Sequence, residues 1–434
     1  MEDLPELILV NIFARFTLKN IARFRLLSRS WKSIIDSDFF RDHYISSNSS
    51  SSSSSSSVSW SIIQTRPHKL SLEIVGHHGC SRWGLDRSPA SLMSFFAETA
   101  IKKLLVLSCT DGLVSIFAEN VDGSPSYYIG NLLSREWFEI PLPSYSSVSC
   151  QNLHSLRKRN RFDDTGLVTK MKNGIVVSYK IVWTLKPDSS SDKLVLMIYS
   201  SDSGTWELKE NVASSLQQHS TAVIGKSIPL NGTLHWLSQD TTTSCIVAYN
   251  FYDDDDDDDG FHIVHFPGKG DELRRFTRSF TTSEEYIVYF NEFNENENRI
   301  FRVWRLVKYE EGGSWELTWE INLFLSLVDL GKDYFPMVMH PLKSEIIYLW
   351  SRDKKGLVLF NLRTLVFSLH KELEDDEKNK SMDGCVLSFN GCREYLKAIY
   401  GYHLEMYQAF PNCLLFSQFV LPRWLHRLPR PLRA

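Results

Sequence analysis

The 434-residue sequence lacks the features that mark secreted, membrane-spanning or disulfide-rich proteins. Its seven cysteines are scattered, odd in number and never spaced as Cys-x-x-Cys, which argues against a disulfide framework and fits a reducing compartment. No apolar run approaches the roughly 18 residues that a membrane span requires. The N-terminus has neither the basic region nor the small-residue cleavage site of a signal peptide. We therefore expect an intracellular protein of the cytoplasm, the nucleus or both, with no membrane partner.

An excess of one charge is also missing. The 48 Lys and Arg residues face 52 Asp and Glu residues, for a formal net charge of -4, so nothing in the overall charge demands nucleic acid as a partner. Hydrophobic residues make up 43% and charged residues 23%, which excludes wholesale disorder. At about 150 residues per domain the length equals about three domains, or fewer if one is a large all-β unit.

Motifs for catalysis or metal binding are incomplete. There is no Gly-x-Ser-x-Gly, and the possible metal ligands of His77–Cys80 have no second pair at zinc-finger spacing. Gly225–Ser227 resembles the end of a phosphate-binding loop, but the first glycine of that motif would fall at Ser220. His235 lies beside Trp236 in an alternating strand pattern, which predicts a packed or hydrogen-bonded structural histidine rather than a catalyst.

A run of aspartates invites a calcium-binding interpretation. Asp255, Asp257, Asp259 and Gly260 match positions one, three, five and six of an EF-hand loop. Position twelve is Phe266 rather than the bidentate glutamate, and the segment leading to it reads as a strand. A solvated acidic loop is the better interpretation. We therefore predict no catalytic residue, no cofactor and no metal.

Nine consecutive serines at residues 49–57 divide the chain. Such a tract has nothing to bury and is typical of a flexible linker. Apolar residues recur at helical spacing before it, whereas short β-rich runs alternate with turn signals after it. The predicted organisation is a helical module at 1–45, a linker at 46–59, an all-β domain at 60–422 and a tail at 423–434.

The first segment predicts three helices. Pro5 suits the first turn of one helix, and Thr17 and Asp38 can cap the two that follow. Each helix has an apolar stripe, and the segment is small for so many large apolar side chains. Some of them are therefore expected to face a partner. The stripes consist of Leu4, Ile8, Ile12, Phe16, Leu9 and Phe13, then Phe24, Leu27, Trp31, Ile34 and Ile35, then Phe39, Phe40 and Tyr44.

These residues resemble the F-box. The resemblance covers about residues 1–45 and rests on Leu4-Pro5, Ile8, Ile12-Phe13, Arg15, Lys19, Arg23-Phe24-Arg25, Ser28-Arg29-Ser30-Trp31, Ile34-Ile35 and Phe39. Two positions depart from the family pattern, since Thr17 replaces a usual second proline and Leu7 replaces a common acidic residue. The resemblance implies a module that docks on a Skp-type adaptor. The expected adaptor-binding residues are Leu4, Pro5, Ile8, Ile12, Phe13, Leu26, Leu27 and Trp31.

Two other interpretations of this segment compete with the adaptor-binding one. It could be a helical cap packed on the rest of the chain. It could also bind DNA, because six Arg and Lys residues and no acid lie between Phe13 and Ile35. A DNA-reading helix needs a polar outward face, and Trp31, Ile34 and Ile35 are expected to crowd this one. The basic residues are then a solvated face.

The second segment predicts an antiparallel all-β body. Many short strands, grouped in units that recur every 50–70 residues and without a βαβ rhythm, are typical of kelch-like or longer propeller repeats. We expect six to eight blades, with a pair of β-sandwiches as the alternative. Trp137, Trp206, Trp315 and Phe367 recur near the ends of the units. The predicted strands are 103–108, 113–118, 126–130, 136–141, 193–200, 205–208, 228–230, 233–237, 299–306, 315–323, 345–350, 357–362, 386–389 and 395–400.

This region resembles the F-box-associated, kelch-like domains of plant F-box proteins. The matching stretches are Tyr127–Asn131 with Trp137 and Pro141, Ser200–Trp206, Asn231–Trp236, and Val303–Leu306 with Trp315. The match covers most of residues 100–365. The final residues fit a blade poorly, so they are either an exposed arm or follow a closing strand at Leu414–Leu421.

The two resemblances together imply a substrate-recognition subunit of an SCF-type ubiquitin ligase. Its adaptor would tether it to cullin and RING subunits, while the β-propeller would hold a target protein that the sequence does not identify. Such a chain would not be an enzyme. The alternatives are a propeller enzyme, such as a hydrolase or oxidase with a site in the central channel, and an adaptor-bound regulator without a degradation target.

Overall fold

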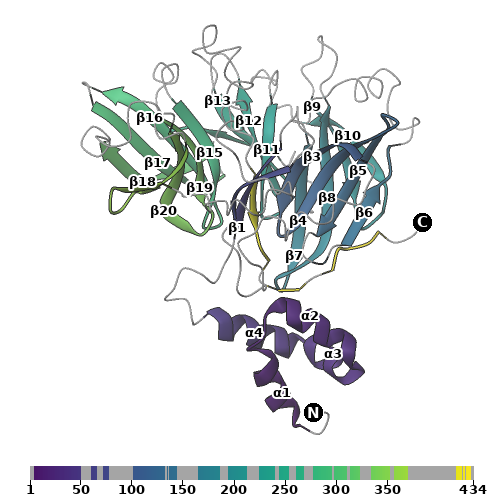
Figure 1. Cartoon of the computed structure of the whole chain (residues 1–434). Coiled ribbons are helices and arrows are strands. Elements are labelled where there is room, and N and C mark those ends of the chain that lie inside the picture. Colours follow the sequence, from purple (N-terminus) through teal and green to yellow (C-terminus); the bar gives the residue numbers. More distant parts are fainter. Residues whose placement is uncertain are drawn as a thin grey trace.

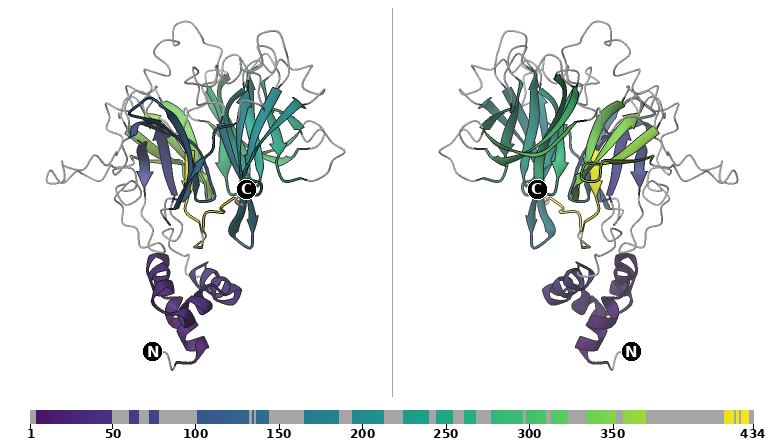
Figure 2. Two further views of the ribbon diagram at one scale, coloured as in Figure 1. Left: turned by 90° about the vertical axis from the view of Figure 1, so that its right-hand side faces the viewer. Right: turned by 90° about the vertical axis from the view of Figure 1, so that its left-hand side faces the viewer.

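The chain folds into a small helical module beside a ring of β-sheets, as the computed structural model in Figure 1 shows. Two further views place the helices at one end of the β-sheets (Figure 2). The described residues are 4–49, 60–65, 72–77, 101–131, 134, 136–143, 165–185, 194–212, 224–239, 244–253, 261–267, 277–295, 298–309, 313–322, 334–351, 356–369, 417–422, 424–425 and 427–431. None of the helices among them is long and apolar enough to cross a membrane.

The helical module contains four helices rather than the three predicted. They are α1 (Glu6–Phe13), α2 (Leu18–Leu27), α3 (Arg29–Ile35) and α4 (Asp38–Ser49). The second predicted helix is divided at Ser28, whose backbone is extended at φ -147° and ψ 141°. Thr17 caps α2 as predicted, because its hydroxyl accepts a hydrogen bond from the Asn20 N–H at 3.3 Å.

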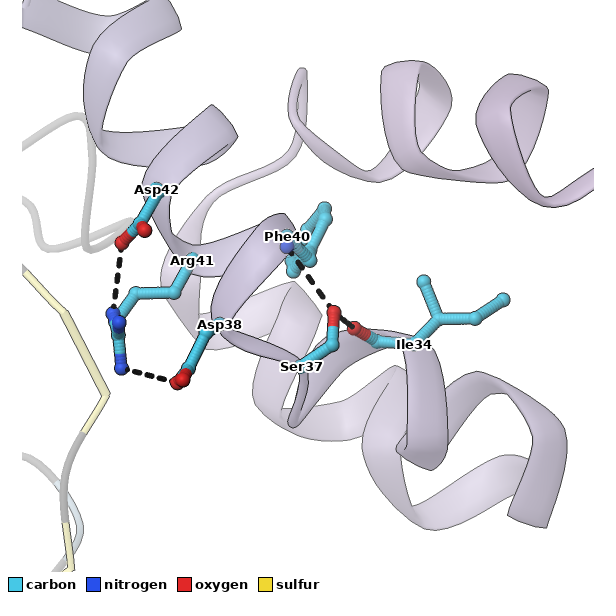
Figure 3. A network of polar contacts seen from close by, with 6 residues as sticks. All are labelled: Ile34, Ser37, Asp38, Phe40, Arg41 and Asp42. Atoms are coloured by element: carbon cyan, nitrogen blue, oxygen red, sulfur yellow. Dashed lines mark hydrogen bonds and ion pairs between the residues drawn. The ribbon is translucent and has the colours of Figure 1, made fainter.

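The cap of α4 corrects the prediction that Asp38 supplies it. The Ser37 hydroxyl accepts from the Phe40 N–H at 3.1 Å and donates to the Ile34 carbonyl at 2.7 Å (Figure 3). Asp38 instead lies in the first turn, where its carboxylate complements the helix dipole and pairs with Arg41 at 2.8 Å. The cap is one residue earlier than predicted because a serine side chain reaches the N–H three residues ahead.

The described strands form six separate sheets, each the equivalent of one propeller blade. Six blades is the lower end of the predicted range, and the alternative of two β-sandwiches is wrong. Five sheets have four strands each. These are β3 (Ile101–Thr110), β4 (Leu113–Asn120), β5 (Pro125–Asn131) and β6 (Glu136–Ile140); β7 (Thr165–Lys172), β8 (Ile175–Leu185), β9 (Leu194–Ser200) and β10 (Trp206–Val212); β11 (Ile224–Leu230), β12 (Thr233–Gln239), β13 (Ser244–Asn250) and β14 (Phe261–His265); β15 (Thr277–Ser283), β16 (Tyr286–Glu295), β17 (Asn298–Lys308) and β18 (Ser314–Asn322); and β19 (Tyr334–His340), β20 (Lys343–Ser351), β21 (Gly356–Asn361) and β22 (Val366–Leu369).

The sixth sheet joins the two ends of the β-domain. It consists of β1 (Trp60–Thr65), β2 (Leu72–His77) and β23 (Ser417–Val420), in the order β2-β1-β23. β23 pairs antiparallel with β1, so that Trp60 is opposite Val420. β23 also packs beside β3, the first strand of the next sheet. The predicted closing strand within Leu414–Leu421 is thus confirmed as β23, the last of the described strands, which closes the ring by pairing with β1.

Gln418 of β23 ties the ring together near its axis. Its side-chain Nε2 donates to the carbonyl of Met339 on β19 at 2.6 Å and to the carbonyl of Thr282 on β15 at 3.1 Å. Its backbone carbonyl accepts from the Cys109 thiol of β3 at 3.4 Å. Gln418 therefore links β23 to the first strands of three other sheets, β3, β15 and β19, all of which are far from it along the chain.

The recurrent aromatics lie where the repeat predicts them, on the outermost strands of four sheets. Trp206 of β10 donates its Nε1–H to the Pro141 carbonyl at 2.5 Å, next to the outermost strand of the preceding sheet. Trp315 of β18 donates in the same way to the His265 carbonyl at 2.7 Å. Trp137 of β6 instead covers its cross-strand partner Gly130, which has no Cβ to obstruct the ring. Trp206 and Trp315 therefore join neighbouring blades at their outer edges, whereas Trp137 packs within its own blade.

The described residues after β23 do not form an exposed arm, which corrects that alternative. Trp424 and Leu428 are both buried. The predicted strands at 386–389 and 395–400 lie outside the described residues.

Candidate functional site

Exposed apolar side chains are concentrated in the helical module, at the start of α1 and the end of α2. Leu26 and Leu27 close α2 and are 84% and 70% exposed. Leu4, Leu7 and Ile8, at and just before the first turn of α1, are exposed as well. We call these five residues the apolar face. Single exposed apolar residues are ordinary on protein surfaces, but a group of them in so small a module marks an interaction site.

The sequence exposes these residues because α1 is apolar on more than one side. Leu9, Val10 and Phe13 fill the core of the helical module and are buried. Leu7 and Ile8 lie about 100° and 200° around the helix from that buried side, so the same core cannot cover them. A helix that is apolar all round needs a second covering surface, and the described chain does not supply one for Leu7 and Ile8.

The residues predicted to bind the adaptor divide into three groups. Leu4, Pro5, Ile8, Leu26 and Leu27 are exposed. Ile12 and Trp31 are half-buried and pack against the core of the module. Phe13 is only 2% exposed, and its ring lies 5.3 Å from Trp31 and 5.7 Å from Phe24 between centroids. Phe13 is therefore a core residue in this structure, and its contact with an adaptor stays a prediction.

Sequence reasoning missed Leu7 in α1 and also two exposed phenylalanines, Phe16 and Phe39. For Phe39 a signal was present in the sequence, in the pair Phe39-Phe40. Neighbouring helical residues are about 100° apart, so a small core that buries one of a pair tends to leave the other outside. Phe40 is fully buried and Phe39 is exposed, as this rule requires.

Helix α3 does not have the crowded apolar outward face that was predicted against DNA binding. Ile34 and Ile35 of α3 are buried and Trp31 is half-buried, so these side chains do not crowd an outward face. The exposed residues of α3 are Arg29, Ser30, Lys32 and Ser33, all of them polar. The exposed leucines at the end of α2 remain the feature that distinguishes this module from a basic reading helix, whose contact surface is polar.

His235 has the structural role that its strand pattern predicts. The residue is fully buried, with Nδ1 at 3.0 Å from the Ile228 carbonyl and Nε2 at 2.7 Å from the Tyr309 hydroxyl. Nδ1–H donates to the carbonyl, so Nε2 accepts from the tyrosine. Burial lowers the pKa of His235 to about 4, although the bond to Ile228 opposes this shift.

This buried histidine predicts a pH-dependent stability. The unfolded side chain binds a proton below about pH 6.5, whereas the folded one binds it only near pH 4, so stability is complete above pH 6.5 and is lost as the pH falls toward 4. We expect a loss of about 3 kcal/mol in the free energy of unfolding from this residue. Urea denaturation of the wild type and of His235→Gln at several pH values measures it.

Tyr309→Phe provides the control for that experiment. It removes the hydroxyl but leaves His235 buried, so the pH dependence should persist. Equal pH dependence in the wild type and in His235→Gln would contradict the assignment.

The other candidate sites contribute no chemistry among the described residues. Gly225–Ser227 lies within strand β11 and does not form a loop around a phosphate. Residues 254–260, which contain the aspartate run, and residues 78–80 lie outside the described chain. Within the described ranges, no group of three or more His, Cys, Asp and Glu side chains is placed to hold a metal ion.

Comparisons with known families match the chain in two adjoining parts. The F-box domain family matches residues 1–43, which contain the four helices up to the first half of α4. The family described as "F-box protein At3g26010-like, beta-propeller" matches residues 58–430, which contain every described strand. The division between the two matches coincides with the serine tract.

Whole-chain relatives come from Arabidopsis thaliana. Putative F-box protein At3g23950 is 56% identical over 433 residues, covering 99% of both chains, and Putative F-box protein At3g23970 is 55% identical over the same length and shares. Putative F-box/kelch-repeat protein At1g15680 is 31% identical over 439 residues, covering 99% of this chain and 95% of that one.

Solved structures are much less similar. The crystal structure of TolB from Acinetobacter baumannii has a TM-score of 0.37 and 10% identity, covering 76% of this chain and 68% of that one. A likeness this weak carries no argument about function. The family matches and the whole-chain relatives are decisive, and they agree with the helices and sheets described above. The chain therefore belongs to the plant F-box proteins that carry a β-propeller of the At3g26010-like family.

Proposed function

We propose that this protein is the substrate-recognition subunit of an SCF-type ubiquitin ligase. The F-box helices bind a Skp-type adaptor, which links the chain to cullin and RING subunits. The β-propeller holds the target protein. The single observation that carries the proposal is the apolar face, because Leu26 and Leu27 are large, highly exposed and located in an F-box.

The contribution of such a subunit to ubiquitin transfer is proximity. Tethering a target beside the ligase turns a bimolecular encounter into a quasi-intramolecular one, at an effective concentration that reaches about millimolar for a short connection. The chain itself makes and breaks no bond in this scheme. The adaptor interface needs to bury about 800 Å² on each partner, with a few apolar residues supplying most of the binding free energy.

The arrangement of the two domains supports separate roles for them, with the adaptor on the F-box and the target on the β-propeller. The helices lie at one end of the β-propeller, and the opposite end of the strands points away from them (Figures 1 and 2). An adaptor on the F-box therefore leaves the far side of the propeller clear for a second protein. Ubiquitin transfer to the target would take place where the adaptor is found, in the cytoplasm, the nucleus or both.

Reconstitution tests the proposal. The full chain, co-expressed with a plant Skp-type adaptor, should elute with it as a one-to-one complex in size-exclusion chromatography. Addition of cullin and RING subunits should bring both into one assembly. In plant cells, trapping of ubiquitinated proteins should recover species that depend on the F-box residues. A chain that elutes as a monomer beside every adaptor offered contradicts the proposal.

A further inference from the structure

The last residues of the chain run between the β-propeller and the F-box. We call residues 421–431, after β23, the C-terminal strap. In Figure 1 the strap passes below the sheets and above the helices before it reaches the C-terminus. It contains two buried anchors, Trp424 at 5% exposure and Leu428 at 4%. Its prolines at 422, 429 and 431 disfavour a helix, so it runs between the β-propeller and the F-box without regular secondary structure.

The strap is fastened to the propeller on both sides of Trp424. On one side, Pro422 rests on the β3–β4 turn so closely that a Cβ on Gly112 would lie 2.8 Å from the proline ring. On the other side, the Leu428 N–H donates to the Glu136 carboxylate of β6 at 2.8 Å. Trp424 is therefore held from both ends and cannot swing freely.

The ring of Trp424 packs against the F-box helix α4. Its centroid lies 5.7 Å from that of Phe40 and 5.2 Å from that of Tyr44, and both of these residues are buried. Tyr44 is itself fixed within the F-box, because its hydroxyl donates to the Phe16 carbonyl at 3.1 Å. Such tilted and edge-on aromatic pairs have a preferred geometry, so they resist rotation as well as separation.

One apolar cluster consequently runs through both domains. Its members include Phe13 and Phe40 of the F-box core, Val114 and Ile116 of β4, and Trp424 between them. Within the described chain, the aromatic ring contacts between the helices and the β-domain are those of Trp424. Protein interiors transmit displacements because they are close-packed, so this continuity makes the two domains one mechanical unit.

Two domains keep a fixed relative orientation only when an apolar interface such as this cluster joins them. Domains joined by a linker move relative to one another unless an apolar interface prevents it. The covalent connection from α4 to β1 runs through the nine-serine tract, whose sequence offers no apolar side chain to build that interface. The C-terminal strap supplies an apolar contact between the two domains from the other end of the chain.

We infer that Trp424 is a positioning residue that sets the orientation of the F-box relative to the β-propeller. The C-terminal strap presents its ring to Phe40 and Tyr44 and so holds the target-binding domain at a fixed angle to the adaptor-binding one. The consequence for ubiquitin transfer rests on the proposed function, since a tethered target gains from proximity only when the geometry allows it to reach the ligase. The orientation itself does not depend on that function.

The test compares distance distributions in the full chain. Spin labels attached to noncanonical amino acids at Arg23 of α2 and Lys308 of β17, both exposed, report on the angle between the domains. We expect a single narrow distribution for the wild type and for Trp424→Phe, and a distribution at least twofold broader for Trp424→Ala. Trp315→Ala removes a ring of the same size from the outer edge of a blade and serves as the matched control, with a narrow distribution expected.

A second variant and a measurement of adaptor affinity distinguish loss of folding, loss of orientation and loss of adaptor binding. Trp424→Leu keeps an apolar side chain at the junction, so it supplies the comparison if Trp424→Ala loses its β-type circular dichroism spectrum. A wild-type width in a folded Trp424→Ala or Trp424→Leu overturns the inference, as does a wild type that is already broad. Adaptor affinity should be unchanged in these variants, and a wild type that binds no adaptor would overturn the proposed function while leaving the distance result intact.

Discussion

A chain carrying Leu26→Asp is expected to lose about 30- to 700-fold of its affinity for a Skp-type adaptor. Truncating an apolar residue at the centre of an interface costs about 2–4 kcal/mol, and tenfold in affinity corresponds to about 1.4 kcal/mol. An aspartate adds to that loss, because the complex would bury a carboxylate without a partner. Isothermal titration calorimetry of the purified chain with the adaptor measures the change.

The same substitution should leave the fold intact, which is why Leu26 is a sharper probe than Ile12. Leu26 is 84% exposed, so the folded chain buries little of it, and an aspartate near the end of α2 costs about 0.3–1 kcal/mol against the helix dipole. Ile12 packs against the core of the module, so Ile12→Asp would disturb folding and binding together.

Val121→Asp is the matched control, since it places the same charge on a 72% exposed apolar residue just after β4. Its adaptor affinity should equal that of the wild type. An undiminished affinity in Leu26→Asp would remove the end of α2 from the interface and leave the start of α1 as the remaining candidate.

The sequence could predict that the F-box presents an apolar surface, but not all of the residues on it. Periodicity identifies the apolar sides of a helix, yet only tertiary packing decides which side is covered. Phe13 illustrates the difference, because it has the same spacing signal as Ile8 and lies in the core with Trp31 and Phe24. The break at Ser28 was missed for a related reason, as the apolar stripe continues through it while the backbone does not.

The β-domain was predictable where turns carry a local signal. The Asn231-Gly232 hairpin has positive φ at both residues, 49° and 78°, as a type I′ turn requires. Strand β8 follows a similar turn, Asn173-Gly174, with φ at 52° and 74°, and was nevertheless missed. Its sequence is a nearly continuous apolar run without the alternation that marks a half-exposed strand. The pairing of β1 with β23 joins opposite ends of the domain, and no local pattern specifies such a partner.

A chain that ends at Phe416 is expected not to fold into a stable β-propeller. It lacks β23 and the C-terminal strap, and with them four buried apolar residues, Phe419, Leu421, Trp424 and Leu428. At about 1.5–3 kcal/mol each these amount to about 6–12 kcal/mol, which is as large as the whole free energy of unfolding of a typical protein, about 5–15 kcal/mol. Thermal and urea denaturation should show no cooperative transition.

Loss of the Gln418 hydrogen bonds alone should weaken the closure of the ring less than loss of the whole of β23. Gln418→Leu fills similar volume but leaves the carbonyls of Thr282 and Met339 without their donor. With the side chain only half-buried, we expect a loss of about 2–4 kcal/mol, from about 1–3 kcal/mol for each group left unpaired. The variant should still unfold cooperatively, at a lower urea concentration.

Two longer truncations separate closure of the ring from orientation of the F-box. A chain ending at Pro431 lacks only residues 432–434 and should unfold like the full chain. A chain ending at Pro422 keeps β23 with Phe419 and Leu421 but loses Trp424, so its propeller should fold while its F-box turns freely. Cooperative unfolding of the chain ending at Phe416, at the wild-type temperature, would mean that β23 does not close the ring. Since β23 and the strap are consecutive in the sequence, the thirteen described residues between 417 and 431 would then stabilise neither domain. That result would disagree with the burial of their apolar side chains in the cores of both domains.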